Sequence, residues 1–293
     1  MALFKNVVEA FIASRHELDS ASLSRLAFWT DALGEREIID ITADDMDAAL
    51  MKLAARGRLT GGKLPTVTAG KPLAGATINR YLSQVGGVFK HARRLKLVPR
   101  AFVPPTRGIE RAPERADPDR YFRPEEVLRL IAVSRVVDKK WGKFAALIVL
   151  AYHTGLRVGS ILATRGKDVD LEAGTLTVPR TKNGDAITAG LSSDALTALK
   201  RLPKVGADEL LFGNRSGKVF TYRPLWLKIA KAANLSGRVF HELRHGHGFA
   251  LARGNVSQQM IMQSMGHRTL VASARYSHAN VGDKQAIIAR VFG

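Results

Sequence analysis

Residues 241–245 read His-Glu-Leu-Arg-His, and this pentapeptide fits two kinds of site that exclude each other. As H-E-x-x-H it matches the zinc-protease pattern, in which two histidines one helical turn apart bind the metal and the glutamate acts as a base. As H-x-x-R it places His241 and Arg244 on one face of a helix, which suits a phosphate group. The rest of the chain has to decide between the two interpretations.

Basic residues dominate one continuous block of the chain. The 293 residues carry a formal net charge of +19. Residues 1–47 contain four Lys/Arg and ten Asp/Glu, whereas residues 48–109 contain twelve Lys/Arg and no acidic residue. Such a block repels itself in a free protein and suits a polyanion. Because no lipidation signal or membrane anchor accompanies the charge, we expect nucleic acid rather than a membrane surface as the partner.

The composition narrows the class of protein further. No apolar run approaches membrane-spanning length, and the N-terminus lacks the order of a signal peptide, so we expect a cytoplasmic protein. The chain has no cysteine, which excludes disulfides, thiolate metal sites and thiol nucleophiles.

Helical patterns fill the N-terminal third. Thr42 and Asp45 predict the start of a helix that ends at Gly57, and residues 58–72 are read as a basic loop. Apolar residues recur at helical spacing in a longer helix over about 73–97. The cations of this loop and helix are the expected DNA contacts: Arg58, Lys63, Lys71, Arg80, Lys90, Arg93, Arg94 and Lys96.

Proline and arginine concentrate in residues 103–118, which we read as a linker between domains 1–102 and 119–293. Pro124 then predicts the first turn of a helix. The second domain also reads as helical, except for β-like runs at 175–178 and 186–188 that flank Lys182-Asn183-Gly184, a hairpin signal. The predicted fold class is therefore mainly α, with a small β-hairpin or sheet in the second domain.

Several short motifs of the second domain are weak when each is taken alone. Thr-Gly-Leu-Arg at 154–157 is most simply a structural ion pair around Arg157, and Lys182 at a hairpin tip is most simply solvated. Gly266-His267 and Tyr276 are equally uninformative singly. In order, however, these motifs and His241–His245 resemble the tyrosine recombinase family, also called the phage integrase family. The resemblance is strong over 119–293 and looser over 1–110, which is similar to the family's helical core-binding domain.

The resemblance implies a role for each residue. Tyr276 is the expected nucleophile, Arg157 and Arg244 clamp the phosphate, and Lys182 is the general acid. His241 and His267 donate hydrogen bonds and help with proton transfer, while His245 and Ser160 support the catalytic residues. The family commonly has an acid at the position of Ser160, and its loss leaves open how the neighbouring catalytic side chains are oriented. The family also prefers Asp at the position of Glu242, which is a milder change.

The implied chemistry also follows from first principles. A covalent tyrosine–phosphate link conserves the energy of a cleaved phosphodiester without ATP. Arginine forks suit the negative charge of the pentacoordinate transition state, and the leaving 5′ oxygen needs a proton. Neither a metal nor a cofactor is required.

The resemblance further implies duplex DNA as partner and a homotetramer on two DNA sites that is monomeric off DNA. It allows an accessory DNA-bending protein and places a bacterial or phage-encoded recombinase in the cytoplasm, at the nucleoid. Residues 281–293, with Ile287, Ile288 and Val291, either pack in cis or dock on a neighbouring protomer.

Three other functions remain to be weighed. In a zinc metalloprotease, Arg244 turned inward would oppose the metal, and Arg157, Lys182 and Tyr276 would have no role. A type IB topoisomerase shares the tyrosine chemistry but relaxes supercoils without strand exchange. A DNA-binding regulator with a dead site is disfavoured because all six catalytic candidates are present.

Overall fold

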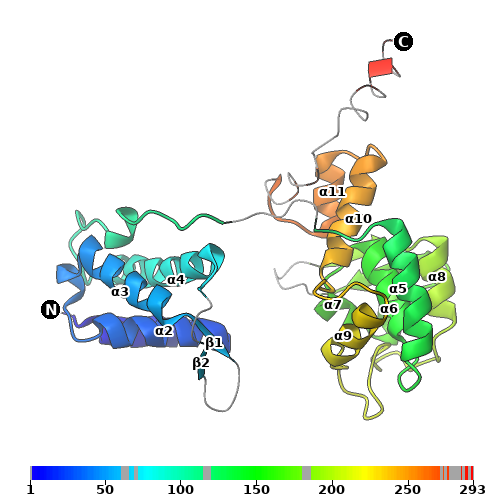
Figure 1. Cartoon of the computed structure of the whole chain (residues 1–293), viewed down its shortest axis with the longest axis horizontal. Helices are drawn as coiled ribbons and strands as arrows, with labels where there is room; N and C mark the ends of the chain where they lie inside the picture. Colours follow the sequence, from blue (N-terminus) through cyan, green and yellow to red (C-terminus); the bar gives the residue numbers. More distant parts are fainter. Residues whose placement is uncertain are drawn as a thin grey trace. The chain divides into compact units, whose positions relative to one another are not determined.

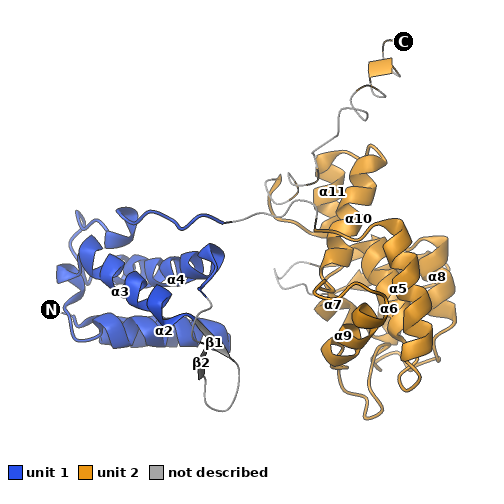
Figure 2. Ribbon diagram, in the orientation of Figure 1, with its two compact units in different colours: residues 1–116 blue, residues 117–293 orange. Residues whose placement is uncertain are grey.

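The computed structural model contains two compact units, residues 1–116 and 117–293 (Figures 1 and 2). The structure describes residues 2–60, 66–68, 72–114, 120–179 and 186–270, together with Ser273, Tyr276, Gln285, Ile288, Ala289 and Phe292. Helices predominate in both units, as the sequence predicts. Among the described residues, no helix is long and apolar enough to cross a membrane.

The first unit is a helical bundle with one small hairpin. The last long helix of this unit, α4, packs on both α1 and α2, which lie far from it in the sequence. Phe4, Trp29 and Phe89 are fully buried in the shared core, and the Trp29 indole N–H donates to the carbonyl of Tyr81 at 3.0 Å. The described elements are α1 (Phe4–Ala13), α2 (Ser20–Leu33), η1 (Ile38–Asp40), α3 (Ala43–Arg56), β1 (Arg58–Thr60), β2 (Thr66–Thr68), α4 (Gly75–Arg94) and η2 (Pro105–Arg107).

Local sequence signals determine where α3 and α4 lie. Thr42 and Asp45 form the predicted capping box, and Gly57, with φ +70°, ends α3. On α4 the apolar residues Leu82, Val85 and Phe89 are buried. The opposite side of the same helix is therefore free to carry cations.

Residues 58–72 differ from expectation, because they are not simply a loop. β1 and β2 pair antiparallel with Leu59 opposite Val67. The glycines and proline between the two runs dominate the sequence pattern, whereas the threonines and Val67 favour strands. The described part of the expected linker packs on the first unit: Pro105 and Ile109 are buried, and the Asn79 amide bonds both the N–H and the carbonyl of Ala112.

The second unit is built around α6, which is apolar on nearly all sides and packs against α5, α8 and α10. Pro124 starts α5 as predicted. The predicted strands pair antiparallel, with Thr177 opposite Thr188, and a short strand that the sequence did not predict joins them. The described elements are α5 (Pro124–Val137), α6 (Phe144–Thr154), α7 (Val158–Leu162), η3 (Gly166–Asp168), β3 (Val169–Asp170), β4 (Thr175–Val178), β5 (Ile187–Gly190), α8 (Ser193–Lys200), α9 (Arg223–Ala232), α10 (Glu242–Arg253) and α11 (Gln258–Met265).

Candidate active site

Arg157 and His267 each follow shortly after a glycine that ends a helix in the left-handed backbone conformation. Gly155 ends α6 with φ +64°, and Gly266 ends α11 with φ +60°. Residues other than glycine rarely adopt this conformation, so both positions favour glycine. After the first turn Leu156 is buried, and Arg157 is the N-cap of α7. After the second turn the chain continues directly into His267.

Arg244 on α10 connects these two turns. Arg244 is only 4% exposed. Its guanidinium donates hydrogen bonds to the Gly155 carbonyl and, at 2.5 Å, to the Met265 carbonyl. Burial, and next the positive charge of Arg157, lower the pKa of Arg244 to about 10, while the Tyr276 phenol opposes this shift. Arg244 therefore stays charged at neutral pH, with Arg157 and Tyr276 beside it.

The Arg157 guanidinium is differently placed. It is half-buried, and within the described part of the chain it takes part in no side-chain hydrogen bond or ion pair. The structural ion pair considered for this residue is thus not observed among the described residues. An arginine held near a second arginine, without a carboxylate partner there, is suited to bind an anion.

Tyr276 lies buried beside α10, with only 3% of its surface exposed. Its hydroxyl lies 3.0 Å from Nδ1 of His245, a hydrogen bond whose donor depends on the histidine tautomer. The His267 ring stacks on the tyrosine ring with centroids 6.3 Å apart, and Phe249 meets it edge-on at 5.2 Å. A Cβ on Gly248 would come within 2.7 Å of the tyrosine ring, so this glycine leaves the space that the phenol fills.

The remaining histidines join this group through ring contacts and short hydrogen bonds. The rings of His241 and His245 meet edge-on at 5.0 Å, and His267 Nδ1 lies 2.7 Å from the Ser273 hydroxyl. Expected only as a supporting residue, His245 contacts the tyrosine hydroxyl directly. The structure thus brings together Arg157, His241, Arg244, His245, His267 and Tyr276.

The remaining predicted residues are on α7, on or just after α4, or outside the described part of the chain. Ser160 is on α7, where its backbone N–H donates to the Arg157 carbonyl at 2.9 Å. Lys182, Lys63 and Lys71 lie outside the described residues, as does the side chain of Arg58 at the start of β1. The five other expected DNA contacts are exposed on or just after α4, in the first unit: Arg80, Lys90, Arg93, Arg94 and Lys96.

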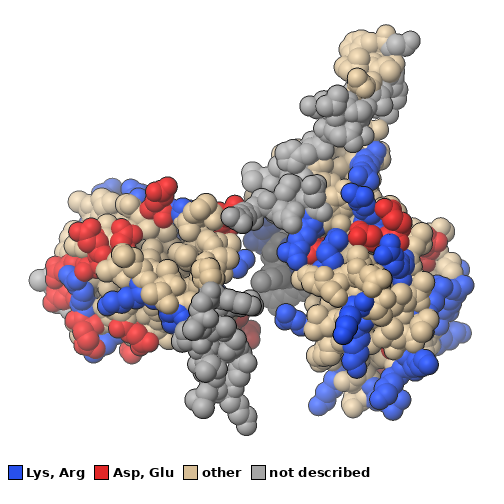
Figure 3. All heavy atoms as spheres, viewed as in Figure 1, with Lys and Arg blue, Asp and Glu red and all other residues tan. Residues whose placement is uncertain are grey.

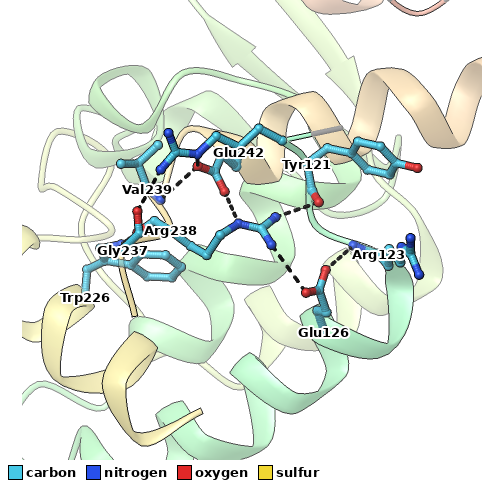
Figure 4. Close-up of polar contacts among 9 residues, drawn as sticks. Tyr121, Arg123, Glu126, Trp226, Gly237, Arg238, Val239 and Glu242 are labelled. Carbon is cyan, nitrogen blue, oxygen red and sulfur yellow. Dashed lines mark hydrogen bonds and ion pairs between the residues drawn. The ribbon is translucent and has the colours of Figure 1, made fainter. Parts of the chain in front are cut away.

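Glu242 is a residue whose importance sequence reasoning missed, because in the H-x-x-R interpretation it has no role. Glu242 is only 2% exposed. Its carboxylate forms an ion pair with Arg120 Nε at 2.9 Å and another with Arg238 Nε (Figure 4). It also accepts the Val239 N–H at 3.2 Å. With both oxygens engaged by guanidinium groups, it is not placed to act as the free base that the zinc-protease interpretation requires. An arginine four residues earlier, Arg238, was the available sequence signal.

His247 is a second residue that the sequence motifs did not single out. It is buried, its Nδ1 lies 2.9 Å from the Tyr152 carbonyl and its Nε2 lies 3.3 Å from the Ser264 hydroxyl. A Cβ on Gly155 would come within 2.4 Å of this ring. The imidazole therefore packs directly under the turn that leads to Arg157. Burial lowers the pKa of His247 to about 4, so the ring is neutral at pH 7.

Comparisons with known proteins point to one family. Residues 120–282 match the model of the phage integrase family. Tyrosine recombinase XerC of Roseiflexus castenholzii is 27% identical over 93% of this chain and 88% of its own length. The type 1 fimbriae regulatory protein FimE of Escherichia coli K12 is 30% identical over 46% of this chain and 73% of its own length.

Solved structures share the fold. The Tn1549 transposon integrase in complex with transposon right end DNA has a TM-score of 0.76 and 18% identity, and the match covers all of both chains. A lambda integrase dimer bound to a COC′ core site has a TM-score of 0.68 and 18% identity over 93% of each chain. The family-model match covers more than half of the sequence, and the chain belongs to the phage integrase family of tyrosine-type site-specific DNA recombinases.

Proposed function

We propose that Tyr276 is the nucleophile that cleaves DNA in this recombinase. The observation that carries the assignment is the Tyr276 hydroxyl, hydrogen-bonded to His245 in a buried site that also holds Arg244. A phenol needs a base to become a good nucleophile at neutral pH, and an imidazole at 3.0 Å is within reach of its proton.

The reaction balances without an external energy source. The Tyr276 oxygen forms a bond to the scissile phosphorus, its proton passes to the histidines, and the phosphorus–O5′ bond breaks. The leaving O5′ takes up one proton, so the products are a 3′-phosphotyrosyl link and a free 5′ hydroxyl. Attack of a 5′ hydroxyl on the phosphotyrosine then reverses these steps and rejoins a strand, because the link keeps the energy of the diester.

The two arginines stabilise the charge that develops on the nonbridging oxygens. Arg157 supplies a guanidinium without a carboxylate partner among the described residues, and Arg244 adds a second positive charge from a buried position. Charge held in place before the reaction is the strongest form of such stabilisation. Lys182 on the β4–β5 connection is proposed to protonate the leaving 5′ oxygen, and His241 and His267 to hydrogen-bond the phosphate.

Duplex DNA is the proposed substrate and partner. The exposed cations of α4 are suited to phosphates, and Lys and Arg side chains are prominent on the face of the second unit in Figure 3. Proteins of similar fold were solved on DNA. We further propose a tetramer on two DNA sites that dissociates to monomers off DNA, acting in the bacterial cytoplasm at the nucleoid, with room for an accessory DNA-bending protein.

A covalent trapping experiment tests the proposal. Wild-type protein is mixed with a library of short nicked duplexes of randomised sequence. After cleavage, the short fragment that carries the 5′ hydroxyl dissociates, so the strand cannot be rejoined and the protein stays covalently bound to the DNA. We expect adducts that survive detergent, and sequencing of their DNA gives the target site. Tyr276→Phe should form no covalent adduct but should still bind DNA non-covalently. Adducts with Tyr276→Phe, or none with the wild type, would overturn the assignment.

Strand exchange on the selected site then tests the recombinase function separately. Two differently labelled duplexes that carry the site should yield rejoined, exchanged products. Relaxation of supercoiled DNA without exchanged products would instead show topoisomerase behaviour.

A further inference from the structure

The carboxylate of Glu242 joins two segments that are far apart in the sequence. One segment, 237–241, is irregular and leads into α10 through His241. The other, 120–126, enters the second unit and begins α5. Figure 4 shows the Arg238 guanidinium between them, with polar contacts to Glu242, Glu126 and the Tyr121 carbonyl.

Three hydrogen bonds to the backbone hold the turn that precedes His241. His241 is the N-cap of α10 but makes no side-chain cap hydrogen bond. The Glu242 carboxylate accepts the Val239 N–H, three residues before it, at 3.2 Å. Arg120 donates to the Gly237 carbonyl at 2.9 Å, and the Trp226 indole donates to the Arg238 carbonyl at 3.1 Å. The backbone just before His241 is thus held at three successive residues.

Arg238 anchors the same turn from the other side. Its guanidinium lies 4.3 Å from the centre of the Phe122 ring, donates to the Tyr121 carbonyl at 2.6 Å and pairs with Glu126 at 3.4 Å. A planar guanidinium can satisfy a carboxylate, a carbonyl and a ring face together, which a lysine cannot. Glu242 completes this arrangement as the buried carboxylate that both Arg120 and Arg238 share.

We propose that Glu242 is a positioning residue for catalysis: through Arg238 and Arg120 it fixes the turn that aims His241 and Arg244 at the scissile phosphate. Glu242 lies next to His241 and two residues before Arg244, about 200° around the helix from the latter. It therefore does not contact the phosphate side. This inference rests on the proposed roles of His241 and Arg244.

The test separates cleavage from DNA binding. Glu242→Gln keeps the size of the side chain but removes the charge that both arginines share. On the nicked duplex selected with wild-type protein, we expect its single-turnover cleavage rate to fall on the order of 100-fold, the effect of a misplacement near 1 Å. Its Kd for the same uncleaved duplex should stay at the wild-type value. Glu242→Asp, which restores a carboxylate, should recover part of the rate.

The matched control is Glu172→Gln, which removes one exposed carboxylate from the β3–β4 turn and should cleave like the wild type. If Glu242→Gln does not fold, the double variant Glu242→Gln with Arg238→Gln decides, because it removes both members of the Glu242–Arg238 pair and so leaves no buried Arg238 charge facing a neutral side chain. Thermal melting defines the temperature at which each variant is folded. Wild-type cleavage by either folded variant, or equal losses of cleavage and DNA binding, overturns the inference. Absence of adduct with the wild type would instead overturn the proposed function.

Discussion

The Tyr276 hydroxyl lies 3.0 Å from His245 Nδ1, although 31 residues separate the two along the chain. The contact is direct, and it forms within a single chain. His245 follows Arg244 on α10, so one short helical segment supplies both a partner of the tyrosine hydroxyl and a cation beside it. The proposed nucleophile, base and phosphate clamp are consequently coupled through the position of one helix.

Substitution of His245 should slow cleavage without weakening DNA binding. His245→Ala removes the nitrogen that contacts the phenol, so we expect a fall in single-turnover cleavage on the order of 100-fold, the usual contribution of a general base. Adduct formation is followed by gel electrophoresis, and binding by fluorescence anisotropy. Cleavage of the nicked duplex by His245→Ala at the wild-type rate would show that this histidine only packs against the tyrosine.

A single methyl group on α10 should displace the nucleophile. Gly248→Ala favours the helix in propensity, yet the new Cβ would meet the Tyr276 ring at 2.7 Å, below any ordinary contact. We expect a large loss of covalent adduct with α10 still helical by circular dichroism. Gly159→Ala on α7 is the control, because nothing lies within 4 Å of its Cβ. Equal activity of the two variants would contradict the packing described for Tyr276.

The elements that the sequence predicted are those with local signals. Thr42 with Asp45, Pro124 and the strand runs beside Asn183-Gly184 each act within a few residues, and the corresponding helices and hairpin strands are present. β1 and β2 were missed because each spans only three residues, and the glycines and proline between them are typical of a loop. β3 spans two residues, too few for any periodic pattern.

The site shows the same division between local and long-range information. The spacing of His241 and Arg244 is enough to place the first at the N-cap of α10 and the second in its first turn, since it depends only on helical geometry. The roles of Glu242 and His247 depend on partners that are remote in sequence. Arg238 meets the Tyr121 carbonyl across 117 residues, and His247 meets that of Tyr152 across 95. No motif of a single sequence records such pairs.

Two cations of α4 should contribute to the salt dependence of DNA binding. Lys90 and Arg93 are exposed and three residues apart, so they share a side of the helix. If each contacts a phosphate, Lys90→Ala with Arg93→Ala should lower the slope of log Kd against log salt by about 2. Lys5→Ala, which removes a cation already paired with Glu35, should leave the slope unchanged. An unchanged slope in the α4 variant would place the DNA elsewhere.

Removal of residues 283–293 should weaken assembly more than binding to a single site. Ile288 and Phe292 are 58% and 80% exposed in the single chain, and this apolar surface is available to a neighbouring protomer. Light scattering of the truncated protein on a two-site DNA should show fewer protomers, whereas its Kd for one site should be unchanged. Equal losses in both measurements would indicate that the segment packs in cis.

His247 should make the fold sensitive to acid. Burial holds its pKa at about 4 in the folded protein, compared with 6.5 for an ordinary histidine. The unfolded chain therefore binds more protons between these values, so the stability associated with the neutral ring is present above pH 6.5 and is lost as the pH falls toward 4. Between pH 7 and pH 5 this loss amounts to about 2 kcal/mol of unfolding free energy, measurable by urea denaturation.

His247→Asn isolates the contribution of this ring. Asparagine does not titrate, while its amide can still donate to the Tyr152 carbonyl, so the variant should lose about 2 kcal/mol less than the wild type over the same pH interval. His91, whose pKa is also lowered by burial, lies in the other unit and contributes equally to both proteins, so it cancels in the comparison. The nearby charge of Arg244 acts in the same direction as burial on the pKa of His247. Parallel pH profiles for variant and wild type would mean that the imidazole under the Gly155 turn is accessible to protons in the folded state.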